Sequence, residues 1–230
     1  MKVLIAEDEH NIRQGLEDIL KAEGYETVTA ENGRIAIELY ESEKPDFICL
    51  DIMMPEMNGY DVCRTIRDNN KDIPVIFISA KSEEVDKVLG LELGADDYIL
   101  KPFGVKEVIA RIRAVTRRYL KSQNLTVKER INSFKMHELE VFPNELRARR
   151  GETLVELSLR DTKILSFLFE NSGQAIDRDK LFNHCWGRNY LPSSRTLDQH
   201  ISKLRKRVEL DVSNPKIICT VHGFGYRFDP

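Results

Sequence analysis

The segment Asp46-Phe47-Ile48-Cys49-Leu50-Asp51 places a short run of apolar residues directly before a carboxylate. Such a run predicts a buried strand. Four similar runs occur in the first 120 residues, and stretches with apolar residues at helical spacing separate or follow them. We predict strands at 2–6, 25–29, 46–50, 74–79 and 97–101, and helices at 10–23, 34–43, 60–68, 83–93 and 105–119. This alternation predicts an α/β fold, a (βα)5 parallel sheet covered by helices on both faces.

Charge divides the chain into two halves. The formal net charge is -3, but residues 1–120 carry 24 acidic and 16 basic side chains, whereas residues 121–230 carry 14 and 19. At 230 residues the chain has room for two domains. We therefore predict an acidic domain at 1–120, a linker at 121–132 and a basic domain at 133–230. A basic domain alone is only a weak indication of nucleic-acid binding.

The composition argues against several classes of protein. The apolar runs are shorter than the roughly 20 residues of a membrane span. The N-terminus becomes acidic at Glu7, too early for a secretion signal. The 4 cysteines form no C-x-x-C pair, which argues against a disulfide framework and against a zinc site. We expect a cytoplasmic protein with no membrane partner.

Reactive side chains stand where the predicted strands end. They are Glu7, Asp8, Asp51, Ser79 and Lys101. Ligands of open parallel sheets bind beyond the carboxyl ends of the strands. Three carboxylates repel one another unless a cation lies among them, and oxygen ligands without His or Cys favour Mg²⁺. Lys101 and Ser79 offer a charge and a hydroxyl to a phosphoryl group, so an acyl phosphate on Asp51 is chemically reasonable. For any of these residues alone, a solvated side chain is the simpler interpretation.

Four motifs of the first half together resemble the receiver domain of bacterial two-component response regulators. They are Glu7-Asp8, Leu50-Asp51-Ile52-Met53-Met54-Pro55-Glu56-Met57-Asn58-Gly59, Ile78-Ser79-Ala80 and Lys101-Pro102-Phe103. The resemblance implies a flavodoxin-like fold with Asp51 as the phosphoacceptor. It implies that Asp8, Asp51 and the Met53 backbone carbonyl bind Mg²⁺, with Glu7 supporting the metal through water. Lys101 and Ser79 would hold the phosphoryl group, and the Lys101–Pro102 peptide would be cis.

The same resemblance implies how phosphorylation is reported. Tyr98 corresponds to an aromatic residue that turns inward when the Ser79 hydroxyl moves toward the phosphoryl group. The segments 83–93, 97–101 and 105–119 resemble the self-complementary dimer face of the OmpR/PhoB branch, which predicts a homodimer on phosphorylation. Its expected members are Lys87, Val88, Leu91, Asp96, Asp97, Glu107, Ala110, Arg111 and Arg118. Between two copies, the implied ion pairs are Lys87 with Glu107, Asp97 with Arg111, and Asp96 with Arg118.

The second half has a different pattern of elements. Alternating short runs predict strands at 134–136, 139–142, 146–149 and 154–157. Helices are predicted between Ser158 and Asn171, at 177–186 and at 194–208, followed by a hairpin of 216–220 and 226–228. This order predicts an α+β domain.

The helix predicted at 194–208 has an apolar stripe and a basic outer face. The stripe consists of Leu197, Ile201, Leu204 and Val208. From Arg188 to Arg207 there are six basic residues and one acid, Asp198. A helix packed on a core with a basic outer face suits the major groove of DNA. On charge alone, a solvated helix explains the pattern equally well.

This helix and the segment 215–228 resemble the winged-helix-turn-helix DNA-binding domain of OmpR/PhoB-type regulators, over about residues 133–229. The resemblance implies base or backbone contacts by Arg195, Thr196, Ser202, Lys203 and Arg205, phosphate contacts by Trp186 and Thr220, and a wing in the minor groove. His222 stands where many members have Arg, so we expect weaker or pH-sensitive wing contacts. Asp161 replaces the usual Glu, which we interpret as a change in helix capping.

We therefore expect a transcriptional response regulator rather than an enzyme, although the receiver assists its own Mg²⁺-dependent phosphorylation and dephosphorylation. The expected partners are a sensor histidine kinase as phosphodonor, promoter DNA, a second copy and RNA polymerase. One alternative is a phosphatase with Asp51 as nucleophile, but Met53 stands where haloacid-dehalogenase-type enzymes have a second Asp. Another is a DNA-binding regulator whose receiver dimerises without phosphorylation.

Overall fold

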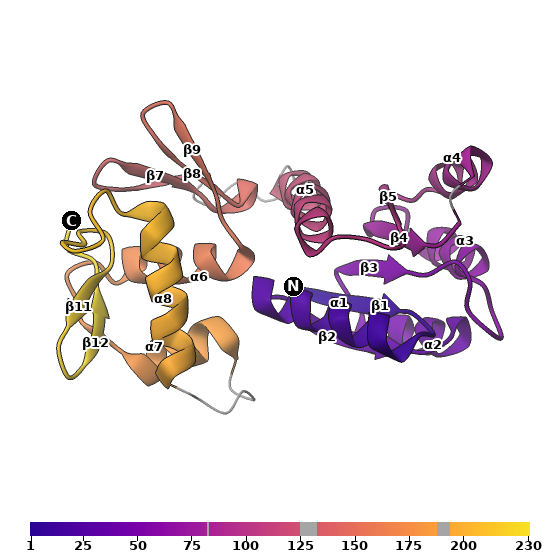
Figure 1. Cartoon of the computed structure of the whole chain (residues 1–230), viewed down its shortest axis with the longest axis horizontal. Coiled ribbons are helices and arrows are strands. Elements are labelled where there is room, and N and C mark those ends of the chain that lie inside the picture. The colour runs from indigo at the N-terminus through magenta and orange to yellow at the C-terminus, as the bar shows by residue number, and fades with distance from the viewer. Residues whose placement is uncertain (82, 125–132, 188–193) are drawn as a thin grey trace. The chain divides into compact units, whose positions relative to one another are not determined.

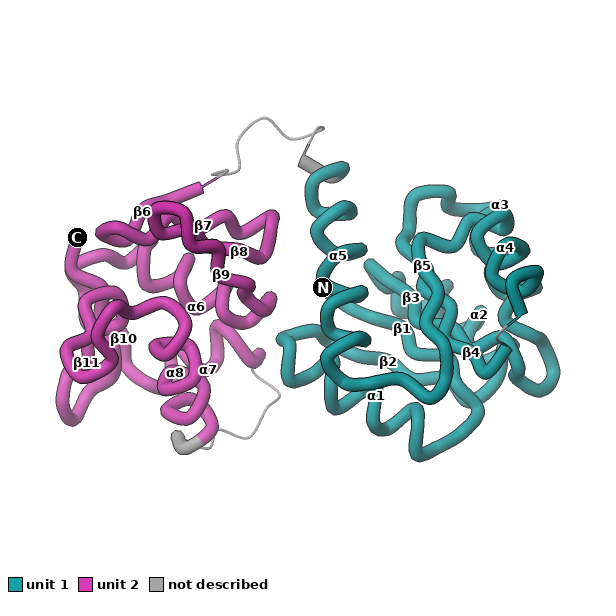
Figure 2. The backbone as a smooth tube through the Cα atoms, turned by 45° about the horizontal axis from the view of Figure 1, so that its top comes forward, with its two compact units in different colours: residues 1–123 teal, residues 124–230 magenta. Residues whose placement is uncertain are grey.

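The computed structural model describes residues 1–81, 83–124, 133–187 and 194–230. The chain forms two compact units, Met1–Gln123 and Asn124–Pro230 (Figure 2). Each unit has its own hydrophobic core. Among the described residues, each helix is too short or too polar to cross a membrane.

The first unit is a (βα)5 fold, as predicted. Its five strands are all parallel in the order β2-β1-β3-β4-β5 (Figure 1). The strands are β1 (Lys2–Ala6), β2 (Glu26–Ala30), β3 (Phe47–Leu50), β4 (Val75–Ser79) and β5 (Asp97–Leu100). The helices are α1 (His10–Glu23), α2 (Gly33–Glu43), α3 (Gly59–Asn69), α4 (Glu84–Glu92) and α5 (Val105–Asn124).

Helices cover both faces of the parallel sheet. Every residue of β3 and β4 is buried, which explains why these strands read as continuous apolar runs rather than alternating ones. On one face, Leu4 and Ile48 pack in a cluster with Ala36 of α2 and Val62 of α3. The alternate strand residues that face the other way are equally buried. All five strands therefore end at one edge of a rigid layer.

Helix α5 is longer than predicted. We expected it to end at residue 119 and a linker to begin at 121, but the helix continues to Asn124. The residues after Tyr119 include no Gly or Pro that would stop a helix, and the Ser122 hydroxyl bonds to the Tyr119 carbonyl oxygen at 2.8 Å. The rest of the expected linker, 125–132, lies outside the described residues. Most other predicted boundaries differ from the observed ones by one or two residues.

The second unit is a winged-helix domain with a leading sheet. The antiparallel order is β6-β7-β8-β9, and a smaller sheet has the order β10-β12-β11. The strands are β6 (Phe134–Met136), β7 (Leu139–Phe142), β8 (Arg147–Arg150), β9 (Thr153–Glu156), β10 (Ile176–Asp177), β11 (Cys219–Val221) and β12 (Gly225–Arg227). The helices are α6 (Leu159–Glu170), α7 (Arg178–Trp186) and α8 (Ser194–Val208), with a 3-10 turn at Pro143–Glu145. Strand β10, only two residues long, was not predicted.

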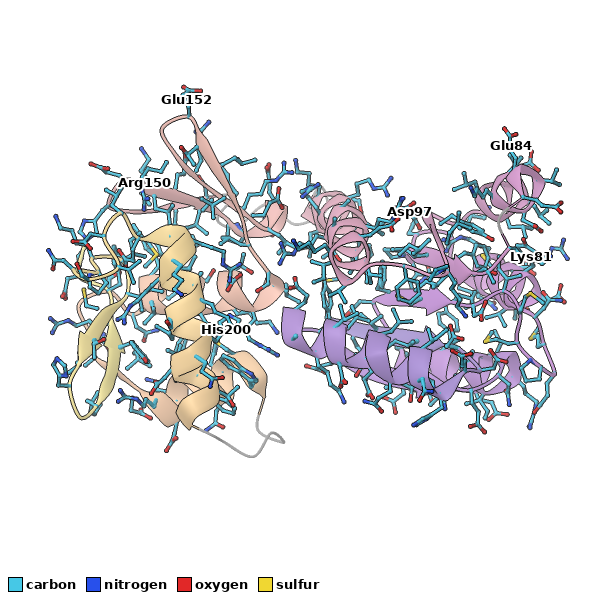
Figure 3. All side chains as sticks on the ribbon, viewed as in Figure 1. Lys81, Glu84, Asp97, Arg150, Glu152 and His200 are labelled. Carbon is cyan, nitrogen blue, oxygen red and sulfur yellow. The ribbon has the colours of Figure 1, made fainter. Side chains whose placement is uncertain are left out.

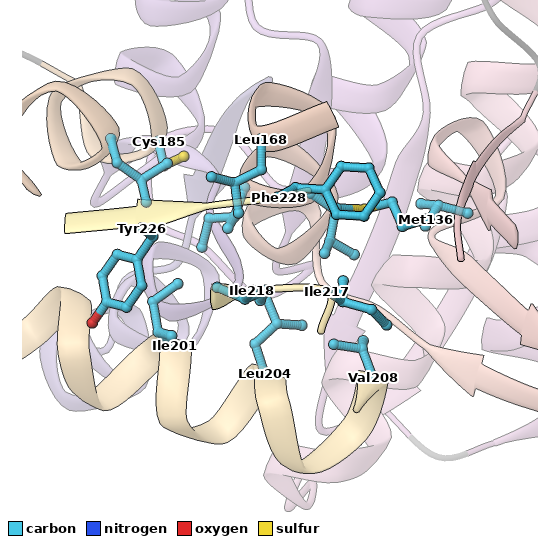
Figure 4. Packing of buried hydrophobic residues seen from close by; sticks show 14 of the residues in the cluster. Met136, Leu168, Cys185, Ile201, Leu204, Val208, Ile217, Ile218, Tyr226 and Phe228 are labelled. Carbon is cyan, nitrogen blue, oxygen red and sulfur yellow. The ribbon is translucent and has the colours of Figure 1, made fainter. Parts of the chain in front are cut away.

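The apolar stripe of α8 is buried as predicted. Leu197, Ile201, Leu204 and Val208 lie in one core cluster with residues of α6, α7 and β12 (Figure 4). Because this face is occupied by the core, the opposite face of α8 is turned outward. Because the resemblance predicts that α8 contacts DNA, we refer to α8 as the recognition helix and to β11, β12 and their turn as the wing.

Candidate functional site

Three carboxylates meet at the carboxyl edge of the first sheet. Glu7 and Asp8 follow β1, and Asp51 follows β3; one carboxylate oxygen of each lies within 4.8 Å of the others. Glu7 and Asp51 are buried, and Asp8 is exposed. The Asp51 backbone N–H donates to the Ala6 carbonyl oxygen at 2.8 Å, and the Met53 N–H donates to Asp51 Oδ1 at 3.1 Å. The parallel register of β1 and β3 thus brings these acids together.

Lys101 approaches the acids from β5. Its Nζ lies 2.6 Å from Asp51 Oδ2 and 2.7 Å from Glu7 Oε2. The backbone N–H of Lys101 donates to the Ser79 carbonyl oxygen at 2.9 Å, and the Lys101–Pro102 peptide is cis. The cluster therefore contains three carboxylates and one ammonium, which contacts two of them.

The pKa values reflect this imbalance of charge. Burial raises the pKa of Glu7 to about 7, and the nearby Asp51 charge adds to this, although Lys101 acts in the opposite direction. Burial by itself would lower the pKa of Lys101, but the hydrogen bonds of Lys101 to Asp51 and Glu7 raise its pKa above the usual value. Clustered hard oxygen ligands on a rigid edge fit a divalent cation such as Mg²⁺.

Ser79 and Tyr98 lie on the strands beside Asp51. Ser79 is fully buried at the end of β4, where its Oγ accepts a hydrogen bond from the Lys81 N–H at 3.3 Å. Tyr98 is also buried, and its hydroxyl donates to the Lys81 carbonyl oxygen at 2.9 Å. Burial raises the pKa of this hydroxyl, which keeps it a donor. Tyr98 therefore has the inward orientation that the resemblance associates with phosphorylation.

Two residues that support the carboxylates were not singled out from the sequence. Arg13 of α1 donates from its guanidinium to the carbonyl oxygens of Glu7 and Asp8, at 2.6 and 3.1 Å. Gly59, at the start of α3, leaves room for the loop that carries Asp51, because a β carbon here would lie 2.1 Å from the Asp51 carbonyl oxygen. Only Gly59 carried a sequence signal, as part of the Asp51 motif.

The predicted dimer face is exposed in the single chain. Val88 and Leu91 of α4 are about half exposed, with relative areas of 47% and 50%, and Ala110 of α5 is exposed as well. Such apolar side chains, set among charges, suit an interface.

Most charged residues of this face already have partners within the chain. Arg111 lies 3.0 Å from both Asp97 and Glu107, and Arg118 donates to the Asp96 carbonyl oxygen at 3.2 Å. The Asp96 carboxylate accepts from the Val75 N–H at 2.9 Å. Lys87 lies on α4, half-buried. Pairing with a second copy would therefore exchange ion pairs rather than create them all.

The recognition helix turns several predicted residues outward. Ser202 and Lys203 are exposed, and Thr196 is half-buried. Arg195 lies in α8, but its side chain is outside the described residues. The predicted DNA contacts that the structure describes on this outer surface are therefore Thr196, Ser202 and Lys203.

Arg205 has a different environment from the one expected. Its Nε donates to the Ile218 carbonyl oxygen at 3.0 Å, and Nη2 donates to Thr220 Oγ1 at 2.8 Å. Both acceptors belong to the segment that enters and forms β11. Two residues predicted as DNA contacts, Arg205 and Thr220, are thus bonded to each other.

Asp161 does more than cap a helix. It forms a capping box with Ser158, and it also lies 2.9 Å from His200 Nε2 and 2.7 Å from Arg207 Nη1, both on α8. The carboxylate is completely buried, which would raise its pKa, but the hydrogen bond to His200 and the Arg207 charge lower the pKa to about 2. The interpretation of Asp161 as a capping change alone was incomplete: it fixes the recognition helix to α6.

Trp186 lies beside this network, half-buried. Its ring is 5.4 Å from the ring of His200, stacks on Phe182 at 4.8 Å, and lies 4.5 Å from the Arg160 guanidinium. The predicted phosphate contact by Trp186 would come from the exposed part of this stack.

The wing begins at a fixed point and ends in an exposed turn. The Glu209 carboxylate, just after α8, accepts hydrogen bonds from the backbone N–H groups of Lys216, Ile217 and Ile218 at 2.8 to 3.2 Å. At the turn, His222 is exposed, and so is Phe224. The wing therefore presents its tip to solvent while its base is held.

Comparisons with known proteins find two families. The response regulator receiver domain model matches residues 3–113, and the model described as transcriptional regulatory protein, C terminal, matches residues 151–228. A probable transcriptional regulatory protein of Picosynechococcus sp. is 41% identical over 99% of this chain and 92% of its own length. The alkaline phosphatase synthesis transcriptional regulatory protein PhoP of Bacillus subtilis is 36% identical over 99% of this chain and 96% of its own length. Among solved structures, a CheY-like receiver domain protein from Methanospirillum hungatei has a TM-score of 0.51 and 25% identity, over 53% of this chain and 97% of that protein.

Proposed function

Because the chain belongs to the OmpR/PhoB family of two-component response regulators, with a receiver domain and a DNA-binding domain, we propose that Asp51 accepts a phosphoryl group from a partner sensor histidine kinase. The observation that carries this proposal is the contact of 2.6 Å between Lys101 Nζ and the buried Asp51 carboxylate. A fixed ammonium there stabilises charge on a group attached to Asp51.

The residues around Asp51 have complementary roles in this proposal. Asp8, Asp51 and the Met53 carbonyl would hold Mg²⁺, and Glu7 would support it through water. When bound, the ion neutralises charge on the transferred phosphoryl group. Lys101 binds a phosphoryl oxygen, and Ser79 donates its hydroxyl to another.

Phosphorylation adds about -1.5 to -2 charges beside Ser79 and Lys101. We propose that this change, passed through Tyr98, favours pairing of two receivers through α4, β5 and α5. Exposed ion pairs contribute only about 0 to 1 kcal/mol each, so they set the register while Val88, Leu91 and Ala110 supply apolar contact.

Pairing then brings two DNA-binding domains to adjacent half-sites about one helical turn apart on promoter DNA. Because pairing links the DNA-binding domains of the two copies, binding of one domain raises the effective concentration of the other at the adjacent half-site. We propose that the protein acts in this way in the cytoplasm, together with RNA polymerase.

The experiment uses the full-length protein, Mg²⁺ and acetyl phosphate as a small phosphodonor. Intact-mass spectrometry should reveal one added phosphoryl group in the wild type and none in Asp51→Asn. Asp68→Asn, which neutralises an exposed carboxylate of α3, should behave as the wild type. A phosphoryl group that persists in Asp51→Asn would overturn the assignment.

A second candidate function is dimerisation that does not need phosphorylation. The inward position of Tyr98, with its hydroxyl bonded to the Lys81 carbonyl oxygen, favours this candidate. Analytical ultracentrifugation separates the two. Dimers that form without acetyl phosphate, equally in wild type and Asp51→Asn, support the second candidate, and dimers that require the donor support the first.

A further inference from the structure

The recognition helix carries one acidic side chain. Asp198 is the single acid between Ser194 and Val208, and 47% of its side chain is exposed. A carboxylate on a helix that enters a groove of DNA lies close to the phosphates of a polyanion, which opposes binding. Asp198 therefore needs a second role to offset that cost.

Asp198 binds the second strand of the wing. The Tyr226 hydroxyl, in β12, donates to Asp198 Oδ1 at 2.6 Å, and Arg178 Nε at the start of α7 donates to the same oxygen at 3.3 Å. The Tyr226 ring is buried in the core, and its hydroxyl points toward α8 (Figure 4). The guanidinium groups of Arg178 and Arg205 lie 5.4 and 5.6 Å from the ring centroid. Burial and the bond to Asp198 raise the pKa of Tyr226 to about 12, so the hydroxyl remains a donor.

A second bond ties the first strand of the wing to the same helix. Arg205 stands seven residues after Asp198, which is two turns or about 10 Å along α8. It donates to the Ile218 carbonyl oxygen and to the Thr220 hydroxyl. Asp198 therefore holds β12 and Arg205 holds β11, so each strand of the wing has its own contact with the recognition helix.

We propose that Asp198 is a positioning residue that fixes the wing relative to the recognition helix, so that the helix in the major groove and the wing tip in the minor groove bind DNA as one rigid unit. The proposal rests on the DNA-binding function of this domain. A wing that is ordered before binding has no conformational freedom to lose when it meets DNA. Loss of the bond would make wing contacts weaker even though an acidic charge has been removed.

The proposal is tested by whether removal of the Asp198 carboxylate weakens or strengthens DNA binding. The probe is a duplex selected from a random-sequence library by the wild-type full-length protein, activated with beryllofluoride and Mg²⁺. Asp198→Ala should bind it about tenfold more weakly, and Tyr226→Phe should do the same. Their combination should be no weaker than Asp198→Ala alone, because both changes remove the same bond between Tyr226 and Asp198. Asp198→Asn keeps an oxygen acceptor and should bind at least as tightly as the wild type.

Glu152→Ala is the charge-matched control, because Glu152 is an exposed acid in the turn between β8 and β9 (Figure 3). It should change affinity by less than twofold. Hydroxyl-radical footprinting supplies a readout that general destabilisation would not change. In Asp198→Ala, protection of the minor groove beside each half-site should be lost while protection by the recognition helix remains.

The outcomes separate this inference from the proposed function. If the wild type selects no duplex, the proposed function fails. If the wild type binds, but Asp198→Ala binds equally or more tightly with full wing protection, a simple repulsive acid explains Asp198 and the inference is overturned. If Asp198→Ala does not fold, Tyr226→Phe decides alone, since it keeps the ring and the charge and removes only the hydroxyl.

Discussion

Replacing Asp161 by Asn should destabilise the DNA-binding domain by about 2 to 3 kcal/mol. The Asp161 carboxylate accepts from the Ser158 N–H on one oxygen and from His200 on the other, so the single amide oxygen of Asn keeps only one of these bonds. The change also removes the negative charge that faces Arg207 at 2.7 Å. Breaking a buried ion pair costs roughly 3 to 5 kcal/mol. Arg207 is 34% exposed, so water compensates part of this.

The lowered pKa of Asp161 corresponds to a free energy of similar size. A pKa lowered from 3.8 to about 2 corresponds to about 2.5 kcal/mol in favour of the folded state. Because the folded-state pKa is the lower one, this stabilisation is complete above pH 3.8 and is lost as the pH falls through 2. The groups that face the carboxylate are His200 and Arg207, both on α8. The difference between wild type and Asp161→Asn should therefore be full at pH 7 and small near pH 2.

The single Trp of the chain makes the measurement specific. Trp186 packs against His200, so its fluorescence follows unfolding of this domain even in the full-length protein. With a urea m-value of about 1.5 kcal/mol/M, the midpoint should fall by about 1.5 M. Glu152→Gln, which neutralises an exposed acid of the same domain, should leave it unchanged. A midpoint shift below about 0.3 M for Asp161→Asn at pH 7 would refute the reasoning.

Three further perturbations test the receiver. Gly59→Ala should slow phosphorylation by acetyl phosphate in intact-mass time courses, because the new methyl group meets the Asp51 carbonyl oxygen. Gly15→Ala should not slow phosphorylation, because the space around Gly15 is open. Equal rates for the two variants would contradict this. Mg²⁺ should raise the thermal midpoint of the receiver in circular dichroism, since the cluster contains three carboxylates and one ammonium, and EDTA should reverse the rise; an unchanged midpoint argues against the metal site. Arg111→Glu should abolish donor-dependent dimers in ultracentrifugation, and adding Asp97→Arg should restore them; dimers that survive the single change would remove this face from the interface.

The (βα)5 sheet could be predicted because its signals are local. Each strand is an apolar run, and the parallel arrangement follows from the intervening helices. Once strands such as β3 are known, Asp51 must stand at the carboxyl edge. The position of the candidate site followed from the same pattern.

What could not be predicted depends on contacts between distant residues. Arg205 was expected to face DNA, but its guanidinium turns to the Ile218 carbonyl oxygen, 13 residues away. The spacing of residues along a helix does not reveal which distant backbone carbonyl needs a hydrogen-bond donor. Asp161 was interpreted correctly as a cap, but its partners His200 and Arg207 lie about 40 residues further along the chain. Strand β10 was too short to give any periodicity.

The carboxylate of Glu209 has a practical consequence for engineering. By accepting hydrogen bonds from the backbone N–H groups of Lys216, Ile217 and Ile218, it closes the segment between α8 and β11 into a loop whose two ends are held together. The exposed residues 210–214 lie within this loop, between its two held ends. Lengthening a closed loop costs little free energy, about 0.6 kcal/mol for each doubling. This loop is therefore where a fluorophore-bearing peptide or an affinity tag can be inserted while the recognition helix and the wing keep their relative positions.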